Sequence, residues 1–266
     1  MRIAFIGGGN MATAMIGGLF AANDVPSKIQ VADPKPEVRA RLEEQWPVNC
    51  YEQASEAIEE VDTIVLAVKP QSLPAVLEDI GGSISAGQLV ISIVAGIPVE
   101  QIASKLNSPA AIIRTMPNIP ALIDQGITAL FANEKCGPEQ LQLAQNLMQS
   151  VGAVVWLEQE DLLDVVTAVS GSGPAYFFYL VEAMQKAGTR LGLPAEVASK
   201  LALHTASGAS AMALQSDIDV AGLRQRVTSK GGTTQAALDI LRAGGFEELV
   251  DAAITAATRR GKELAE

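Results

Sequence analysis

The chain contains very few of the residues that bind metals or act as general bases. Its 266 residues include two cysteines, Cys50 and Cys136, and one histidine, His204. The cysteines lie far apart in the sequence and form no C-x-x-C pair. We therefore expect neither a zinc site nor a Cys–His catalytic pair, and no metal cofactor.

Basic and aromatic residues are also scarce. The formal net charge is −11, the pI is near 4.7, and aromatic residues make up 4% of the chain although 48% is hydrophobic. An acidic chain without a basic run repels nucleic acid and anionic membranes. The most apolar later run, residues 175–181, is too short to span a bilayer, and no signal-like segment precedes the first glycines. These features predict a cytoplasmic protein that binds neither nucleic acid nor membrane.

Apolar strand-like runs alternate with helix-like segments in the first part of the chain. Such alternation is typical of a parallel α/β sheet covered by helices on both faces. The expected strands are residues 3–6, 29–31, 62–68, 89–94, 111–114 and 127–131. The expected helices are residues 10–22, 36–46 and 98–106. We predict that residues 1–158 form one domain of this class.

The pattern of the remaining residues, 159–266, is that of an all-α domain. The expected helices are residues 161–168, 174–190, 194–213, 219–227, 234–242 and 246–262. The helix at 174–190 is apolar nearly all round, since Tyr176 and Tyr179 mark one face while Phe178 lies on the other. A small helical domain has too little interior to bury such a helix. We therefore expect it to pack against a partner chain in a homo-oligomer.

A glycine-rich motif, Gly7-Gly8-Gly9-Asn10-Met11-Ala12, follows the first expected strand. The form G-x-G-x-x-A is typical of Rossmann dinucleotide-binding domains: Gly7 permits a tight turn, Gly9 lets the backbone approach a pyrophosphate, and Ala12 lets the helix pack closely on the strand. The helix that follows offers free N–H groups to the phosphates. An ordinary glycine-rich turn has a similar sequence, but the position of this motif directly after the first strand favours cofactor binding.

Asp33 lies about where an acidic residue contacts the adenine ribose in such domains. Its carboxylate would accept a hydrogen bond from the 2′-hydroxyl of NAD and repel the 2′-phosphate of NADP, whereas Lys35 and Arg39 would offset that repulsion. Alternatively, Asp33-Pro34-Lys35-Pro36 is a plain turn that opens the next helix. The choice between NADPH and NADH therefore stays open.

Three further segments follow strands and are expected to line the same cleft, because ligands of such sheets bind at the carboxyl ends of the strands. They are Ala67-Val68-Lys69-Pro70, the stretch around Ala95, and the loop around Asn118. Alternatively, Lys69 is an ordinary surface residue that does not contact the cofactor. Asn118 would offer its amide near the nicotinamide, or would simply belong to a rigid loop between two prolines.

Two segments of the helical part combine small polar residues with glycine. Residues 169–176 form at least a turn between helices, with Pro174 at the start of the next helix. Residues 227–234 form a hydroxyl- and glycine-rich loop whose free backbone N–H groups suit a carboxylate. Thr233 or Thr234 would serve equally well as an ordinary helix N-cap.

Four motifs, taken in order along the chain, resemble the landmarks of the pyrroline-5-carboxylate reductase family. They are the glycine loop, Ala67-Val68-Lys69-Pro70, Ser170-Gly171-Ser172-Gly173-Pro174-Ala175-Tyr176, and the S-x-G-G-x-T core at residues 229–234. The resemblance covers essentially the whole chain. It implies a Rossmann domain followed by an all-α dimerisation domain, a homodimer or larger ring of dimers, and NADPH-dependent reduction of 1-pyrroline-5-carboxylate to L-proline, the last step of proline biosynthesis.

The resemblance also implies roles for single residues, in an active site where one subunit's cofactor cleft meets residues of the helical domain. Ser229 and the backbone N–H groups around Gly231, Gly232 and Thr233 would hold the substrate carboxylate, and Thr234 would hydrogen-bond the ring nitrogen. Ile119 stands where many relatives have Thr. Asp33-Pro34 replaces the small or basic residues common in NADPH-preferring members, which keeps NADH in consideration.

The implied chemistry suits a chain with a single histidine. A protonated imine is already electron-poor and takes its proton from solvent, so the protein mainly has to hold the imine carbon near the nicotinamide. The Thr234 hydroxyl is able to accept from or donate to the ring nitrogen, and His204 is interpreted as structural. The alternatives are a 3-hydroxyacid-type dehydrogenase, which would need a base such as Lys230, and a non-catalytic nucleotide-sensing protein.

Overall fold

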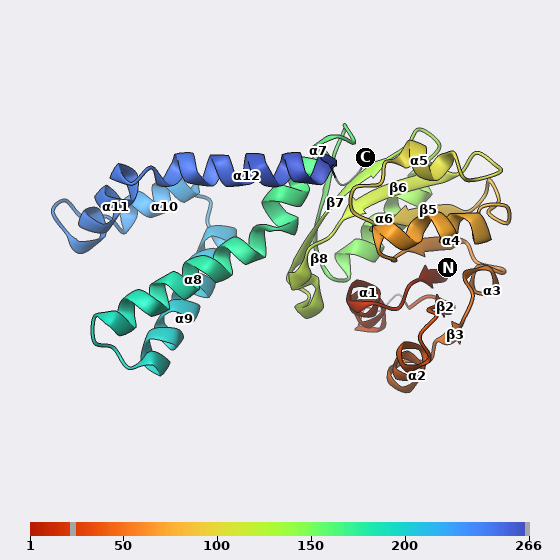
Figure 1. Cartoon of the computed structure of the whole chain (residues 1–266), viewed down its shortest axis with the longest axis horizontal. Helices are drawn as coiled ribbons and strands as arrows, with labels where there is room; N and C mark the ends of the chain where they lie inside the picture. Colours follow the sequence, from red (N-terminus) through yellow and green to blue (C-terminus); the bar gives the residue numbers. More distant parts are fainter. Residues whose placement is uncertain (22–24, 264–266) are drawn as a thin grey trace. The chain divides into compact units, whose positions relative to one another are not determined.

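A computed structural model describes residues 1–21 and 25–263 of the chain. It divides into two compact units: Met1–Gly171 with Ala257–Glu266, and Ser172–Ala256. The predicted helix at 10–22 ends outside the described residues at Ala22. Figure 1 labels most of the helices and strands of the two units, which are described separately below.

The first unit is built on one eight-stranded sheet with the order β3-β2-β1-β4-β5-β6-β7-β8. The strands are β1 (Arg2–Ile6), β2 (Lys28–Ala32), β3 (Asn49–Tyr51), β4 (Thr63–Leu66), β5 (Leu89–Ser92), β6 (Ala111–Met116), β7 (Gly126–Ala132) and β8 (Gly152–Trp156). The first six follow the order of a doubly wound dinucleotide-binding sheet. The predicted α/β class is therefore confirmed.

The prediction that the sheet is parallel needs one correction, because β7 pairs with β6 in the antiparallel direction. All other neighbouring strands pair in parallel. The segment between Met116 and Gly126 holds only the short 3₁₀ helix η2 (Ile119–Ile123). A parallel connection needs a crossover of a dozen or more residues, so this short segment returns the chain in the opposite direction.

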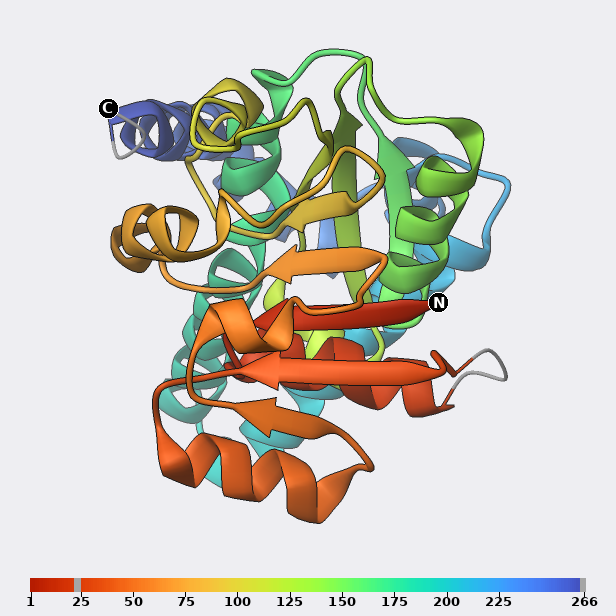
Figure 2. The same ribbon diagram turned by 90° about the vertical axis from the view of Figure 1, so that its right-hand side faces the viewer.

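Helices cover both faces of the sheet, as expected (Figure 2). On one face, side chains of α1 (Asn10–Ala21), α2 (Pro36–Gln45) and α6 (Pro138–Gln149) share a core with Ile3 and Phe5. On the other, α3 (Ala54–Ala57), α4 (Leu73–Ile80) and α5 (Val99–Ala103) share a core with Ala4 and Ile6. Successive residues of β1 thus point to opposite faces, and both sets are buried.

A buried arginine of the sheet forms ion pairs with two acidic residues that follow the last strand, β8. Arg114 on β6 is 6% exposed, and its guanidinium lies 3.0 Å from Glu160 and 3.7 Å from Asp164. Glu160 also accepts a hydrogen bond of 2.8 Å from the backbone N–H of Val99. The two ion pairs hold the start of α7 (Leu162–Val166) to the sheet, and the π-helix η3 (Thr167–Gly171) follows directly.

The second unit is helical, as predicted. It contains α8 (Gly173–Arg190), α9 (Ala195–Gln215), α10 (Val220–Arg226), α11 (Thr233–Ala243) and most of α12 (Phe246–Glu263). Helices α8 and α9 lie side by side (Figure 1), with Val181, Ala198 and Ala202 buried. The described parts of α10, α11 and α12 bury no residue.

The helical unit leaves large apolar side chains exposed in the single chain. Phe177, Phe178 and Tyr179 of α8 are 61%, 66% and 73% exposed. The surplus of apolar surface expected from the sequence is therefore present. The boundary between residues 158 and 159 stays a prediction, since the compact units divide between Gly171 and Ser172. No described helix is both long and apolar enough to cross a membrane.

Candidate active site

The segments expected to bind a dinucleotide all follow strands that end at the same edge of the sheet. The glycine loop follows β1, and Asp33 follows β2. Ala67 follows β4, while Ala95 and Asn118 come after β5 and β6. Because β2, β1, β4, β5 and β6 are mutually parallel, the structure brings these segments to one edge. The strand order turns between β1 and β4, which is where such sheets bind their ligands.

The three glycines of the loop have three different surroundings. Gly7 has a φ of +105°, and a Cβ there would lie 2.5 Å from the carbonyl oxygen of Ala67. A Cβ on Gly8 would lie 2.7 Å from Val38 of α2. A Cβ on Gly9 would meet no atom within 4 Å. Gly7 is therefore required by its backbone conformation and by the backbone packed against it, Gly8 is closely packed against a side chain of α2, and the surface at Gly9 is open to a ligand.

The start of α1 presents unused hydrogen-bond donors. The backbone N–H groups of Gly9, Asn10 and Met11 have no partner among the described residues, whereas the N–H of Thr13 bonds the carbonyl of Gly9 at 2.9 Å. These donors and the positive end of a 12-residue helix suit an anion. The donor set fits the pyrophosphate of a dinucleotide.

The carboxylate of Asp33 is bonded to the glycine loop. Its Oδ2 accepts from the N–H of Gly8 at 2.9 Å, and its Oδ1 accepts from the N–H of Lys35 at 3.0 Å. Arg39 donates to the backbone carbonyl of Asp33 at 2.7 Å and lies 3.6 Å from Glu52. Each carboxylate oxygen keeps a lone pair for a ribose hydroxyl, so the ribose contact of Asp33 stays a prediction.

The segment after β4 begins with the N–H of Ala67, which bonds the carbonyl of Ile6 at 2.8 Å. Lys69 is exposed, and Pro70 opens the short 3₁₀ helix η1 (Pro70–Ser72). Ala95, after β5, is exposed as well. These side chains are accessible to a ligand at this edge.

Asn118 has a structural partner on each side of its amide. Its Nδ2 donates to the carbonyl of Ser170 at 3.1 Å, and its Oδ1 accepts from the N–H of Ile127 at 2.9 Å. The side chain is nearly buried, with 9% of the residue exposed. One amide hydrogen remains for a nicotinamide. The link to Ser170 carries no signal in the sequence, because it joins two loops that are distant along the chain.

The second candidate region lies in the helical unit, between α10 and α11. The N-cap of α11 is Gly232, without a side-chain cap bond. The interpretation of Thr233 or Thr234 as an ordinary N-cap is therefore wrong, because both already lie inside the first turn of α11. Gly232 donates its N–H to the carbonyl of Ser229 at 3.0 Å, which closes the loop on itself.

This loop also has free donors. The N–H groups of Gly231, Thr233 and Thr234 have no partner within the described part of the chain. Gly231 has a φ of +73°, a left-handed conformation that favours glycine. The N–H of Gly232 is used within the loop, so it adds nothing for an anion. The remaining donors suit a carboxylate.

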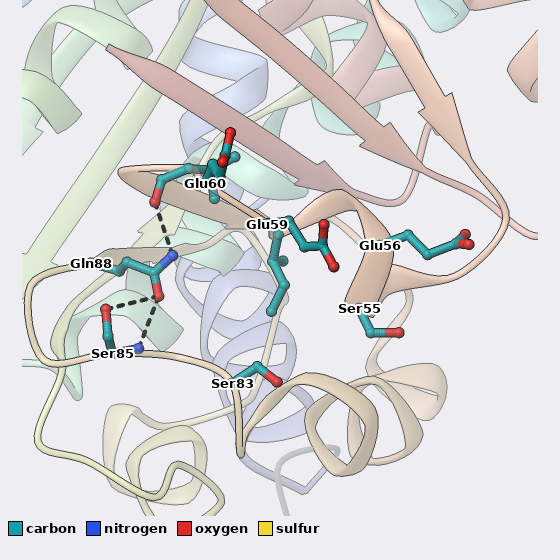
Figure 3. Close-up of a pocket in the computed structure, with 9 residues that line it drawn as sticks. Ser55, Glu56, Glu59, Glu60, Ser83, Ser85 and Gln88 are labelled. Atoms are coloured by element: carbon teal, nitrogen blue, oxygen red, sulfur yellow. Dashed lines mark hydrogen bonds between the residues drawn. The ribbon is translucent and has the colours of Figure 1, made fainter.

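Two hollows of the first unit lie outside both candidate regions. One, of about 510 Å³, lies at the amino ends of β4 and β5. Glu56, Glu59 and Glu60 line it (Figure 3), and would repel a phosphate. The other, of about 640 Å³, lies near Met1, before β1. Among residues 1–21 and 25–263, no three His, Cys, Asp or Glu side chains gather into a possible metal site.

Two family models match the chain. Residues 160–264 match the model described as pyrroline-5-carboxylate reductase dimerisation. Residues 2–96 match the model described as NADP oxidoreductase coenzyme F420-dependent.

Curated relatives match the chain over its whole length. The pyrroline-5-carboxylate reductase of Pseudomonas aeruginosa is 47% identical over 265 residues, which covers 100% of this chain and 97% of the relative. The pyrroline-5-carboxylate reductase of Pasteurella multocida is 40% identical over 267 residues, which covers 98% of this chain and 97% of the relative.

Solved structures agree with these matches. A pyrroline-5-carboxylate reductase from Coxiella burnetii has a TM-score of 0.94 at 40% identity, covering 100% of this chain and 98% of that one. The Plasmodium falciparum pyrroline carboxylate reductase, solved with NADP bound, has a TM-score of 0.87 at 28% identity, with coverage of 100% and 98%.

Proposed function

The chain belongs to the pyrroline-5-carboxylate reductase family, and from that premise we propose that it reduces 1-pyrroline-5-carboxylate to L-proline. It is an oxidoreductase of proline biosynthesis that uses NADPH or NADH. The observation that carries this function is full-length similarity to reductases of this name, joined to a loop at Gly9–Met11 whose donors are free for a pyrophosphate.

The sheet edge of the first unit would hold the cofactor. The N–H groups of Gly9, Asn10 and Met11 bind the pyrophosphate, and Asp33 faces the adenine ribose. The remaining contacts along this edge come from Gly7, Gly8, Ala12, Ala67, Val68, Lys69, Pro70, Ala95 and Asn118. The bound cofactor supplies the hydride. Support for this assignment is the common edge of these segments and the open space at Gly9.

The loop before α11 would hold the substrate. The N–H groups of Gly231 and Thr233 and the hydroxyl of Ser229 bind the carboxylate, while Gly232 keeps the loop closed through its bond to Ser229. The hydroxyl of Thr234 holds the ring nitrogen. The imine takes its proton from solvent, so these residues bind and orient and none has to act as a strong acid. His204 lies exposed on α9 and has no part in this mechanism.

We further propose a homodimer or a larger ring of dimers, with each active site completed by helical residues at the subunit contact. The match of residues 160–264 to a dimerisation family and the exposed aromatic side chains of α8 support this assembly. A cytoplasmic location remains a prediction.

A spectrophotometric assay tests the proposed function. The intact protein is mixed with 1-pyrroline-5-carboxylate and either NADPH or NADH, and cofactor oxidation is followed with time. We expect imine-dependent oxidation that yields proline. Oxidation of 3-hydroxyacids without imine reduction would favour the dehydrogenase alternative, and nucleotide binding without imine-dependent oxidation would favour a nucleotide-sensing protein.

A further inference from the structure

We propose that Arg41 is a positioning residue for the cofactor, because it fixes the peptide group that presents the N–H of Gly9 to the pyrophosphate. Arg41 lies on α2, 33 residues along the chain from Gly8, and no motif marks it. The inference rests on the proposed function only in that the chain binds NADPH or NADH through its glycine loop.

The contact between Arg41 and the loop is direct. Its Nη2 donates to the carbonyl oxygen of Gly8 at 3.1 Å and to the hydroxyl of Thr13 at 3.2 Å. The same hydroxyl points its own proton toward the Gly8 carbonyl, with 3.4 Å between the oxygens. Both bonds of the guanidinium are partly buried. A cationic donor in such surroundings makes a stronger bond than a neutral one.

The geometry of the peptide group links this contact to the cofactor. The carbonyl of Gly8 and the N–H of Gly9 belong to one peptide group, and the described chain has no cis peptide bond. In a trans peptide these two groups point in opposite directions. Holding the carbonyl toward α2 therefore turns the N–H of Gly9 away from α2. The space around this residue is open, since a Cβ on Gly9 would meet no atom within 4 Å. That N–H is one of the free donors at the start of α1.

The preceding peptide group is held as well. The N–H of Gly8 donates to Asp33 at 2.9 Å, so an anionic and a cationic side chain fix the two peptide groups on either side of Gly8. Glycine is otherwise the residue with the most backbone freedom. A loop that is ordered before the ligand arrives binds more tightly, because less freedom is lost on binding.

This arrangement distinguishes Arg41 from a residue that recognises the 2′-phosphate of NADP. The guanidinium is bonded to the loop, and the ammonium of Lys35 is exposed at the start of α2. NADPH and NADH share the pyrophosphate and differ only at the ribose. If Arg41 acts through Gly9, its loss weakens both cofactors equally. If Arg41 contacts the 2′-phosphate, its loss weakens NADPH alone.

The experiment measures the Kd of NADPH and of NADH for the full-length protein by titration. We expect Arg41→Met to weaken both by roughly tenfold, the effect of one lost charge-assisted hydrogen bond, with an unchanged ratio of the two Kd values. The KM for the imine at saturating cofactor should not change. The matched control is Arg2→Met, which removes an arginine bonded to Asp62 at 2.7 Å at the amino end of β1; both Kd values should stay at the wild-type level.

Thr13→Val keeps the side-chain shape but removes the hydroxyl between Arg41 and Gly8, so it serves as the second variant should Arg41→Met not fold. We expect a smaller loss that is again equal for the two cofactors. Wild-type Kd values in the folded variants, or a loss confined to NADPH, would overturn the proposal. A wild-type protein that binds cofactor but does not reduce the imine would instead overturn the proposed function and leave this inference standing.

Discussion

The side-chain amide of Asn118 donates a hydrogen bond to the backbone carbonyl of Ser170, with 3.1 Å between the two atoms. The amide oxygen accepts from the N–H of Ile127. One side chain thus joins the end of β6, the start of β7 and the π-helix η3. Such π-helical turns are frequent at functional sites. The last two residues of this one, Ser170 and Gly171, begin the segment Ser170-Gly171-Ser172-Gly173, which leads into α8.

Replacing Asn118 by Asp should disturb this segment. The variant keeps an oxygen for the N–H of Ile127 but sets a carboxylate oxygen against the carbonyl of Ser170. We expect kcat/KM for the imine to fall by roughly tenfold, since a buried bond is replaced by a repulsion. Steady-state kinetics measure the effect. Asn107→Asp, a change of the same kind at an exposed position, is the control. Wild-type kinetics in Asn118→Asp would contradict the role of this link.

Neutralising Asp33 should shift the cofactor preference toward NADPH. The carboxylate would otherwise repel the 2′-phosphate and bind the 2′-hydroxyl of NADH. Asp33→Ser also removes the acceptor of the Gly8 N–H, so both cofactors should bind less tightly as the ratio of kcat/KM values moves toward NADPH. Asp33→Asn retains an acceptor for Gly8 and should show the shift with a smaller overall loss. An unchanged ratio in both variants would mean that Asp33 does not face the ribose.

Removing the hydroxyl of Thr234 should slow imine reduction while leaving cofactor binding intact. The residue lies in the first turn of α11, beside the free N–H groups of the loop. One lost hydrogen bond to the reacting nitrogen costs about 1–3 kcal/mol, which is roughly one to two orders of magnitude in rate. Thr234→Ala is compared with Thr234→Ser, which keeps the hydroxyl and should remain active. A folded Thr234→Ala enzyme with normal kcat/KM would remove Thr234 from the mechanism.

The two cysteines should react slowly with alkylating reagents in the folded protein. Burial, reinforced by Glu43, raises the pKa of Cys50 to about 11. Burial also raises the pKa of Cys136. Only the thiolate reacts, and a pKa near 11 leaves about one thiolate per thousand at pH 8. Labelling with iodoacetamide should therefore be slow at pH 8, faster at higher pH, and rapid in urea. Fast labelling of the native protein at neutral pH would contradict these shifts.

Much of this fold could be predicted because its central strands are long apolar runs and its glycine loop has a recognisable spacing. The short edge strand β3 was missed, since Asn49, Cys50 and Tyr51 give no apolar run. The direction of β7 was missed because alternation of strand and helix does not report strand direction. Helices α3, α4 and α6 and strand β8 are likewise not among the predicted elements.

The candidate site was predictable wherever its residues are consecutive. Two of its segments, Gly7 to Ala12 and Ser229 to Thr234, are local motifs, so their sequences alone suggest free N–H groups. The contact of Arg41 with Gly8 is tertiary, because it depends on how α2 packs against the loop. The alternative that Thr233 or Thr234 is an ordinary N-cap follows from the commoner use of a hydroxyl as the cap, whereas the N-cap of α11 is Gly232.

The last prediction concerns the apolar surface of the helical unit, which a partner subunit should cover. Phe178 is 66% exposed in the single chain, between Phe177 and Tyr179, which are also exposed. Obligate interfaces bury on the order of 2,000 Å² or more, and a charge in their centre is costly to desolvate. Phe178→Glu should therefore yield a monomer that binds nucleotide but no longer reduces the imine.

Sedimentation at assay concentration, compared between the wild type and Phe178→Glu, tests this. Nucleotide binding by the variant is the control, because it shows that the first unit is still folded. If the active site is completed at the subunit contact, activity and assembly must be lost together. A wild-type protein that sediments as a fully active monomer would contradict both the interface and the shared site.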